Sequence, residues 1–465
     1  MGGSLFFAKI PLYNTDTKQG VTMENKLLAR YPLGYEKRTW KQDYFILSLS
    51  SPAPFGTEKL KEKDALTRQK LRRSVKTSID AGFNLLGCLW ADSTSAMDIV
   101  RCAEGYGAKV LFQDLKGFGG MGDSNIFCQK NDLLGAIDKT ANYDSVMGYC
   151  LWDEPILDEH LTVVRKMVEE VERICPEKLA YTVAVPDYHP LCRWEDDAFA
   201  PYIDKFLDTI EPSVLSFDYY PVGKREYDEK LQLDNSTMWS DLEIARRAAQ
   251  KRNMPLWFYY QEHHYHFHGW DYDFTFPMAR AMANAGILYG AKGLEAYVEF
   301  DGFIDPYTGK EGAFFDEQKA FNREVANLGN TLMALKCKRV IHDDTLLPDH
   351  KSMVGLRSKL SESELLTGRL FARISVSEHE DDYGNKYLMV LNRDFKRTSH
   401  FSLTLKEKSN IYEVSKNDGE QRLIYTGETV LPVRLAPGEL ALFRIQNATE
   451  TPYTVEYYLD KDNNA

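Results

Sequence analysis

The sequence predicts an α/β protein: a (β/α)8 TIM barrel followed by a C-terminal β-sandwich domain. Short apolar runs alternate with amphipathic helical patterns, which is typical of right-handed βαβ units and a parallel sheet. Acidic and aromatic residues gather where these runs end. After about residue 340 the helical period disappears, and closely spaced strand patterns with Gly, Asn and Pro turns indicate a β-sandwich.

The apolar runs number eight, as one (β/α)8 barrel requires. We expect the barrel strands at residues 44–50, 83–90, 109–115, 146–155, 180–185, 214–220, 255–262 and 293–300. Helical patterns stand between or after them at residues 60–81, 95–106, 133–139, 158–174, 240–252, 277–289 and 316–335. The competing fold, an open doubly wound sheet, lacks its glycine fingerprint, because Gly117–Gly122 does not match a phosphate-binding loop.

These patterns divide the chain into four parts. We expect an N-terminal cap segment over the barrel floor (1–40), the barrel (41–338), the β-sandwich (339–448) and a C-terminal tail (449–465). Within the sandwich, strand patterns occur at residues 370–377, 386–392, 401–405, 411–414, 422–425, 433–435 and 439–445.

Composition excludes some classes of partner. The 465 residues carry a net charge of -12, which disfavours nucleic acid because phosphate binding needs a basic surface. No apolar run reaches the length of a membrane span, and the first residues do not form a convincing signal peptide. The seven cysteines are scattered without a C-x-x-C pair, as reduced thiols are. We therefore expect a cytoplasmic protein, or a secreted or periplasmic one if a leader has been removed; the oligomeric state is not predicted.

The fourth apolar run carries the strongest functional signal. It reads Gly-Tyr-Cys-Leu-Trp-Asp-Glu-Pro and ends in Trp152, Asp153, Glu154 and Pro155. Active sites of TIM barrels lie at the carboxyl ends of their strands, so Glu154 is a candidate general acid/base there. The structural alternative is a strand-end carboxylate in an ion pair or at the start of the next helix.

This run resembles the Asn-Glu-Pro signature of the retaining (β/α)8-barrel glycoside hydrolases, which include β-galactosidases and cellulases. The resemblance implies that Glu154 is the acid/base and that Glu262, at the end of strand seven, is the nucleophile cleaving a β-linked glycan without a cofactor or metal. Retention needs carboxyls about 5–5.5 Å apart, and inversion roughly 6.5–9.5 Å. The trailing β-sandwich resembles the accessory domain of many such enzymes.

Asp153 departs from that signature, because the superfamily has Asn there. An Asp-Glu pair instead resembles the N-acetyl-β-hexosaminidases, including N-acetylgalactosaminidases with an Asp-Glu-Pro motif. That resemblance implies that Asp153 orients the substrate's acetamide as the nucleophile and Glu154 is the acid, so that Glu262 is incidental. A glycan-binding barrel without catalysis is the third alternative.

Strand eight and a histidine run add further candidates. Alternation along strand eight brings Glu299 near the barrel mouth as a reserve nucleophile, whereas Glu295 lies deeper as a buried, paired acid. The run His263–His268 holds four histidines, which could bind a metal, but no partner ligand motif stands elsewhere. We therefore expect His263 and His264 to bind sugar hydroxyls.

Other strand ends are also polar and aromatic. Aromatic faces stack on sugar C–H surfaces and carboxylates bind hydroxyls, although any single aromatic residue is more often part of a core. Gln113 and Trp270 belong to this pattern. The substrate-binding candidates are Trp152, Asp153, Trp90, Asp92, Asp114, Asp218, Tyr219, Tyr220, His263, His264 and Glu299.

Overall fold

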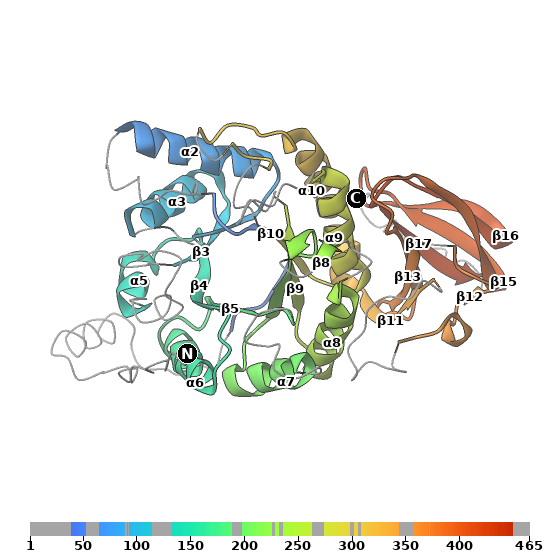
Figure 1. The fold of residues 1–465 in the computed structure, drawn as a ribbon, viewed down its shortest axis with the longest axis horizontal. Helices are drawn as coiled ribbons and strands as arrows, with labels where there is room; N and C mark the ends of the chain where they lie inside the picture. The colour runs from blue at the N-terminus through green and yellow to red at the C-terminus, as the bar shows by residue number, and fades with distance from the viewer. Residues whose placement is uncertain are drawn as a thin grey trace, which may run out of the picture.

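A closed parallel barrel and a curled antiparallel sheet make up the protein, as the sequence predicts (Figure 1). The computed structural model describes residues 39–52, 65–88, 91, 93–113, 133–187, 198–225, 228–231, 236–262, 274–297, 302–305, 308–343, 357–371 and 373–449. The sheet domain lies beside helix α9 (Phe276–Leu288), where Asn284 donates a hydrogen bond to the Gly438 carbonyl at 2.8 Å.

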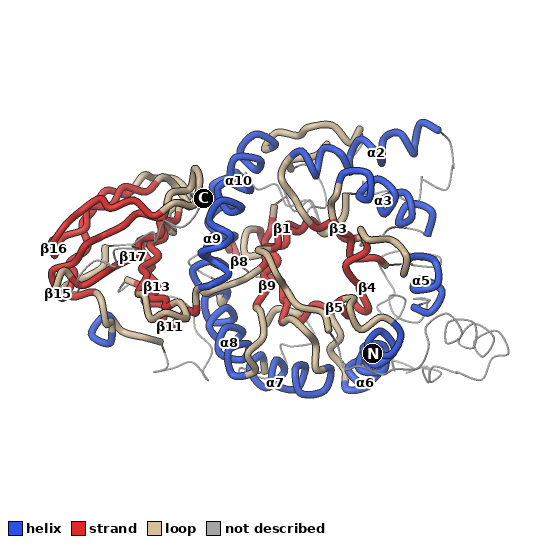
Figure 2. The backbone as a smooth tube through the Cα atoms, turned by 180° about the vertical axis from the view of Figure 1, so that it is seen from behind, coloured by secondary structure: helices blue, strands red, loops and turns tan. Residues whose placement is uncertain are grey.

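The barrel closes in the order β1-β2-β3-β4-β5-β6-β9-β10, and every neighbouring pair is parallel. Figure 2 shows these strands as a ring surrounded by helices. Their bounds are β1 Ile46–Leu49, β2 Leu85–Gly87, β3 Lys109–Phe112, β4 Val146–Asp153, β5 Leu179–Ala184, β6 Leu215–Tyr219, β9 Leu256–Gln261 and β10 Gly293–Tyr297.

The surrounding helices follow the predicted order, but one helix and one β-hairpin between strands β5 and β9 were not predicted. The helices are α2 Ala65–Asp80, α3 Ser93–Tyr106, α5 Leu133–Thr140, α6 Asp158–Ile174, α7 Phe199–Ile210, α8 Met238–Lys251, α9 Phe276–Leu288 and α10 Phe315–Ala334. Helix α7 was not predicted, although Phe199, Ile203, Phe206 and Ile210 are buried at helical spacing. A hairpin of β7 (Gly223–Arg225) and β8 (Asp228–Leu231) was also not predicted.

Strand residues alternate between the barrel interior and the layer under the helices. The interior cluster is Ile46, Leu85, Leu111, Cys150, Leu179, Tyr181, Val183, Val214, Trp257 and Tyr259. At the amino-terminal end of the barrel, the Trp257 indole donates to Gln42 Oε1 at 2.8 Å, and Trp40 packs edge-on against Trp257. The described start of the chain therefore crosses the barrel floor; residues 1–38 of the predicted cap lie outside the described part.

Within the described residues, the C-terminal sheet contains seven strands, as many as predicted, but they divide the chain differently. It runs β11 (Lys336–His342), β13 (Ile374–Glu380), β14 (Lys386–Asn392), β17 (Leu440–Asn447), β15 (Ser399–Val414) and β12 (Leu366–Thr367), and β16 (Gln421–Leu435) pairs with β15. Four predicted strands, at 401–405, 411–414, 422–425 and 433–435, thus form two long strands, β15 and β16. Register shifts near Ser409 bend β15 and β16 without breaking their pairing, so the sheet curls around one apolar cluster.

Two further expectations concern cysteines and membranes. The five cysteines in the described residues are free thiols: Cys88, Cys102, Cys150, Cys175 and Cys337. Among the described helices, none is long and apolar enough to cross a membrane.

A buried ion pair of the sheet domain packs against the barrel. Arg393 is 1% exposed and pairs with Asp343, and its guanidinium lies 5.5 Å from the centre of the Trp239 ring on α8. Removing one partner of a buried pair leaves the other charge without compensation, which costs about 3–5 kcal/mol. We expect Arg393→Met to lower the free energy of urea unfolding by about 3 kcal/mol or more.

An exposed pair provides the control for that experiment. Arg422 pairs with Asp418 on the sheet domain, and both side chains are exposed. Exposed pairs contribute about 0–1 kcal/mol, so Arg422→Met should change the free energy of unfolding by less than about 1 kcal/mol. Equal losses in the two variants would show that the buried pair contributes no more to stability than the exposed pair does.

Candidate active site

A β-bulge in β4 brings an acid into the barrel mouth. Cys150 faces the interior, and strict alternation would then turn Trp152 inward. Instead the register shifts between Cys150 and Trp152, so that Trp152 pairs with Thr182 and Asp153 pairs with Val183. Since Val183 belongs to the interior cluster, Asp153 also faces inward. Bulges commonly re-aim side chains next to active sites.

Glu154 leaves the strand in a strained conformation. Its φ of 55° lies in the left-handed region, which residues other than glycine rarely adopt. Such positions cost about 1–3 kcal/mol and concentrate at functional sites. The turn directs the half-buried Glu154 side chain to Asp218, with which its carboxyl forms a hydrogen bond.

Asp218 comes from β6, two strands away from β4. Side chains of alternate barrel strands share a layer, so Asp218 and Asp153 approach each other across β5. Asp218 is 6% exposed, and Tyr220, the residue after β6, donates a hydrogen bond to it. The structure therefore brings together Asp153, Glu154 and Asp218, three carboxyls from two strands.

Burial and mutual repulsion keep these carboxyls partly protonated. Burial, followed by the charges of Asp218 and Asp153, raises the pKa of Glu154 well above its usual value. Burial raises the pKa of Asp153 to about 6 and, with the charge of Asp153, raises the pKa of Asp218 to about 7. A hydrogen bond between two carboxyls needs one proton, and Glu154 holds it, because this bond raises the pKa of Glu154 and lowers that of Asp218. The site thus offers an acid near neutral pH.

The raised pKa of Asp218 makes stability depend on pH. An unfolded Asp titrates near pH 4, and Asp218 titrates at about 7, so the native state binds the extra proton between these values. The stabilising contribution of this group is complete below about pH 4 and is lost as the pH rises to about 7. We expect the stability of Asp218→Asn relative to the wild type to increase from pH 4 to pH 7 in urea unfolding.

Asp418 on the sheet domain is the control for this pH dependence. Hydrogen bonds from Ser415 and Glu420 lower its pKa, so its contribution to stability is present at neutral pH and is lost as the pH falls. Asp418→Asn should therefore show a small change of opposite sign. A relative stability of Asp218→Asn that stays flat with pH would contradict the raised pKa of Asp218.

A fourth acid, Glu295, lies one layer deeper in the barrel than these three carboxyls. Glu295 on β10 accepts hydrogen bonds from Ser216 Oγ at 2.5 Å and from Tyr181 Oη at 2.8 Å, and Tyr259 also donates to it. Burial raises the pKa of Glu295 to about 8 despite these donors. This network forms the layer beneath Asp218, and the charge of Asp218 also raises the pKa of Glu295.

Aromatic residues occupy different faces of the strand ends. Tyr220 stacks on Tyr297, with ring centroids 4.8 Å apart, and both pack against the barrel interior. Tyr219 instead points outward, where its hydroxyl lies 2.8 Å from Thr237 Oγ1. Trp152 also lies in the outer layer and packs on His160 of α6. Of these predicted substrate-binding residues, only Tyr220 lies at the barrel mouth; Tyr297 was not predicted, although alternation from Glu295 would have identified it.

Glu262 lies apart from the three carboxyls. It follows Tyr260 on β9 by two residues and shares the outward face, where the Tyr260 hydroxyl accepts a hydrogen bond from Gln318 of α10. Glu262 is fully buried, and neither carboxylate oxygen has a hydrogen-bond partner in the described residues. Burial raises its pKa well above the usual value. The charge of Glu262 raises the pKa of Tyr260. The charges of Glu154 and Asp153 do not contribute to the raised pKa of Glu262.

The remaining predicted site residues cannot be placed. Trp90, Asp92, Asp114, His263, His264 and Glu299 lie outside the described residues. Within the described ranges, no group of three or more His, Cys, Asp or Glu side chains is arranged to hold a metal ion.

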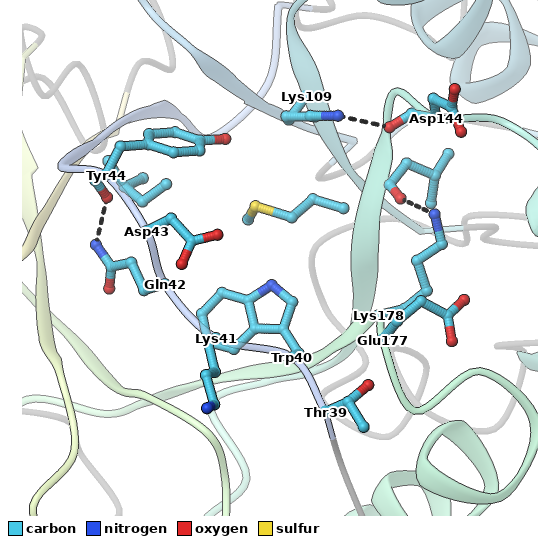
Figure 3. A pocket seen from close by; sticks show the side chains of 13 residues that line it. Thr39, Trp40, Lys41, Gln42, Asp43, Tyr44, Lys109, Asp144, Glu177 and Lys178 are labelled. Carbon is cyan, nitrogen blue, oxygen red and sulfur yellow. Dashed lines mark hydrogen bonds between the residues drawn. The ribbon is translucent and has the colours of Figure 1, made fainter.

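A cavity of about 430 Å³ lies at the opposite end of the barrel (Figure 3). Residues 39–44 and the starts of β1, β3 and β4 line it. Two of its three lysines donate hydrogen bonds to the backbone: Lys109 to the Asp144 carbonyl at 2.8 Å and Lys178 to the Val146 carbonyl at 2.6 Å. The cavity therefore belongs to the barrel floor and is separate from the carboxyl cluster.

Comparisons with known proteins give only distant similarities. No family model matches the chain, and no curated protein matches its sequence. A GH27 β-L-arabinopyranosidase from Geobacillus stearothermophilus aligns over 88% of this chain and 97% of its own, with 10% identity and a TM-score of 0.48. An α-amylase from Anoxybacillus aligns over 88% and 99%, with 10% identity and a TM-score of 0.47.

A putative α-galactosidase from Bacteroides fragilis aligns over 87% of this chain and 79% of its own, with 10% identity and a TM-score of 0.45. Similarity at this level does not identify a reaction.

Proposed function

We propose that the protein is a glycoside hydrolase in which Glu154 is the general acid/base. One observation carries the proposal: the Glu154 carboxyl forms a hydrogen bond with Asp218, beside Asp153, at the carboxyl end of a closed barrel. A glycosidic oxygen leaves readily only if an acid protonates it, and that acid must remain protonated near neutral pH. Raised pKa values from burial and neighbouring carboxylates meet this requirement.

Asp153 is the favoured partner of Glu154. Its pKa of about 6 leaves it largely ionised at neutral pH, although it is half-buried. An ionised carboxylate beside the acid can accept the N–H of a substrate acetamide and stabilise the positive charge that develops when the acetamide oxygen attacks the anomeric carbon. The acetamide-assisted reaction of an N-acetyl-β-hexosaminide is therefore our first mechanism.

The two-carboxylate retaining mechanism with Glu262 as nucleophile is the second candidate. A nucleophile must be ionised and must lie near Glu154. The raised pKa of Glu262 and its position on the outer face of β9 favour Asp153 over it. One observation supports Glu262: its buried carboxyl has no hydrogen-bond partner in the described residues, and a catalytic role is one explanation for such a group in a folded protein.

A panel of aryl glycosides tests the function. It should contain N-acetylated β-hexosaminides and the matching sugars without the acetamide. We expect hydrolysis of at least one N-acetylated member and much slower hydrolysis of its non-acetylated counterpart. Hydrolysis independent of the acetamide would favour the second mechanism. Sugar binding without turnover on every member would support a glycan-binding barrel and contradict the enzyme.

A further inference from the structure

Gln113 stands at the barrel mouth directly after β3. Leu111 belongs to the interior cluster, whereas Val110 and Phe112 lie in the outer layer, so alternation turns Gln113 inward. Phe112 pairs with Tyr149 of β4, which puts Gln113 beside Cys150, next to the bulge that orients the first acid.

The Gln113 amide is buried but incompletely bonded. The residue is 2% exposed, and its Oε1 has no hydrogen-bond partner in the described residues. Nearly all buried polar atoms in folded proteins have a partner, because leaving one unpaired is costly. An open acceptor at this position is therefore unusual.

Gln261 shows what a structural glutamine looks like in the same barrel. It also faces inward at a strand end, and it is 1% exposed. Its Oε1 accepts from the Val222 amide at 3.1 Å, and its Nε2 donates to the Val222 carbonyl at 2.8 Å. Both polar atoms of the Gln261 amide thus have hydrogen-bond partners within the fold.

A second open acceptor lies on the other side of Asp153. Asp218 Oδ1 is buried and has no hydrogen-bond partner in the described part of the chain, although other atoms bind this carboxyl. β3 and β6 flank the β4–β5 pair, so Gln113 and Asp218 face the space in front of Asp153 from two sides. Two acceptors that face the same space fit a ligand with several hydroxyl donors.

We propose that the Gln113 amide binds one hydroxyl of the sugar ring held at Glu154 and thereby selects sugars that carry this hydroxyl. This inference rests on the proposed function. A hydroxyl both donates and accepts, so it satisfies the amide in either orientation. A site that binds a substrate hydroxyl rejects the analogue without it, because the buried polar group is then left unpaired.

Monodeoxy substrates test this contact. The wild type should cleave one monodeoxy analogue of its best aryl glycoside at least about 10-fold less efficiently in kcat/KM than the parent. The Gln113→Leu variant should cleave the parent glycoside with a kcat/KM about 10-fold below that of the wild type. Its kcat/KM values for the parent glycoside and for that monodeoxy analogue should be equal. Its melting temperature should be unchanged or higher, because an unpaired buried acceptor has been removed. Gln113→Met, with an unbranched side chain, repeats the test if the leucine variant does not fold.

Gln261→Leu is the matched control. It removes two hydrogen bonds of the fold, so its melting temperature should fall, while its ratio of parent to monodeoxy activity should equal the wild-type ratio. A wild-type ratio in both Gln113 variants would overturn the proposed contact and leave the proposed function standing. A wild-type protein that neither binds nor cleaves any glycoside would overturn both.

Discussion

Replacing Glu154 with Gln should lower kcat by about 10³-fold or more on glycosides with poor leaving groups. The amide keeps the size of the side chain and can still donate to Asp218, but it cannot protonate the departing oxygen. Glycosides with strongly activated leaving groups need little protonation, so their turnover should fall much less. The measurement is kcat across aryl glycosides of increasing leaving-group pKa.

Glu211 provides a matched control. It has the same left-handed backbone conformation, with φ of 51°, and it pairs with Arg165 at the end of α7, away from the barrel mouth. Glu211→Gln should leave kcat unchanged on every leaving group. Near-normal turnover of Glu154→Gln on poor leaving groups would remove Glu154 from the acid role.

The second large expected effect distinguishes the catalytic roles of Asp153 and Glu262. We expect Asp153→Asn to lower kcat/KM on N-acetylated substrates by about 10²-fold or more, because a neutral amide cannot stabilise the charge on the attacking acetamide. Glu262→Gln should change the same quantity by less than about threefold, since the Glu262 carboxyl acts on Tyr260, on the outward face of the strand. Steady-state kinetics of both variants make the comparison.

A thiazoline, which mimics the cyclised acetamide intermediate, sharpens that result. It should inhibit the wild type competitively and bind Asp153→Asn much more weakly. The reverse pattern, with Glu262→Gln inactive, a covalent glycosyl-enzyme in the wild type and no thiazoline inhibition, would establish Glu262 as the nucleophile.

The barrel and the position of its first acid could be predicted because their signals are local. Eight apolar runs alternate with helical patterns, and Asp153 and Glu154 stop one run before a proline. The direction of each side chain could not be predicted in the same way. The bulge in β4 moves Trp152 to the outer layer and Asp153 to the interior, which is a property of the pairing with β5 and leaves no mark in the sequence of β4 alone.

Glu262 illustrates the same limit on strand β9. The run Leu256–Gln261 is apolar or aromatic at nearly every position, as expected of a strand buried on both faces. Without alternation, the sequence indicates that Glu262 lies at a strand end but not which face it shares. Asp218 was easier to predict as a site residue, but its hydrogen bond to Glu154 depends on the layer that β4 and β6 form across the barrel.

The pH dependence of kcat/KM tests most directly whether Glu154 acts as the protonated acid. Activity should decline on the alkaline side as Glu154 loses its proton, because this limb reports an essential acid of the free enzyme. The residual activity of Glu154→Gln on an activated dinitrophenyl glycoside should lack that limb. An alkaline limb that is unchanged in Glu154→Gln would contradict the assignment and place the catalytic proton on another group.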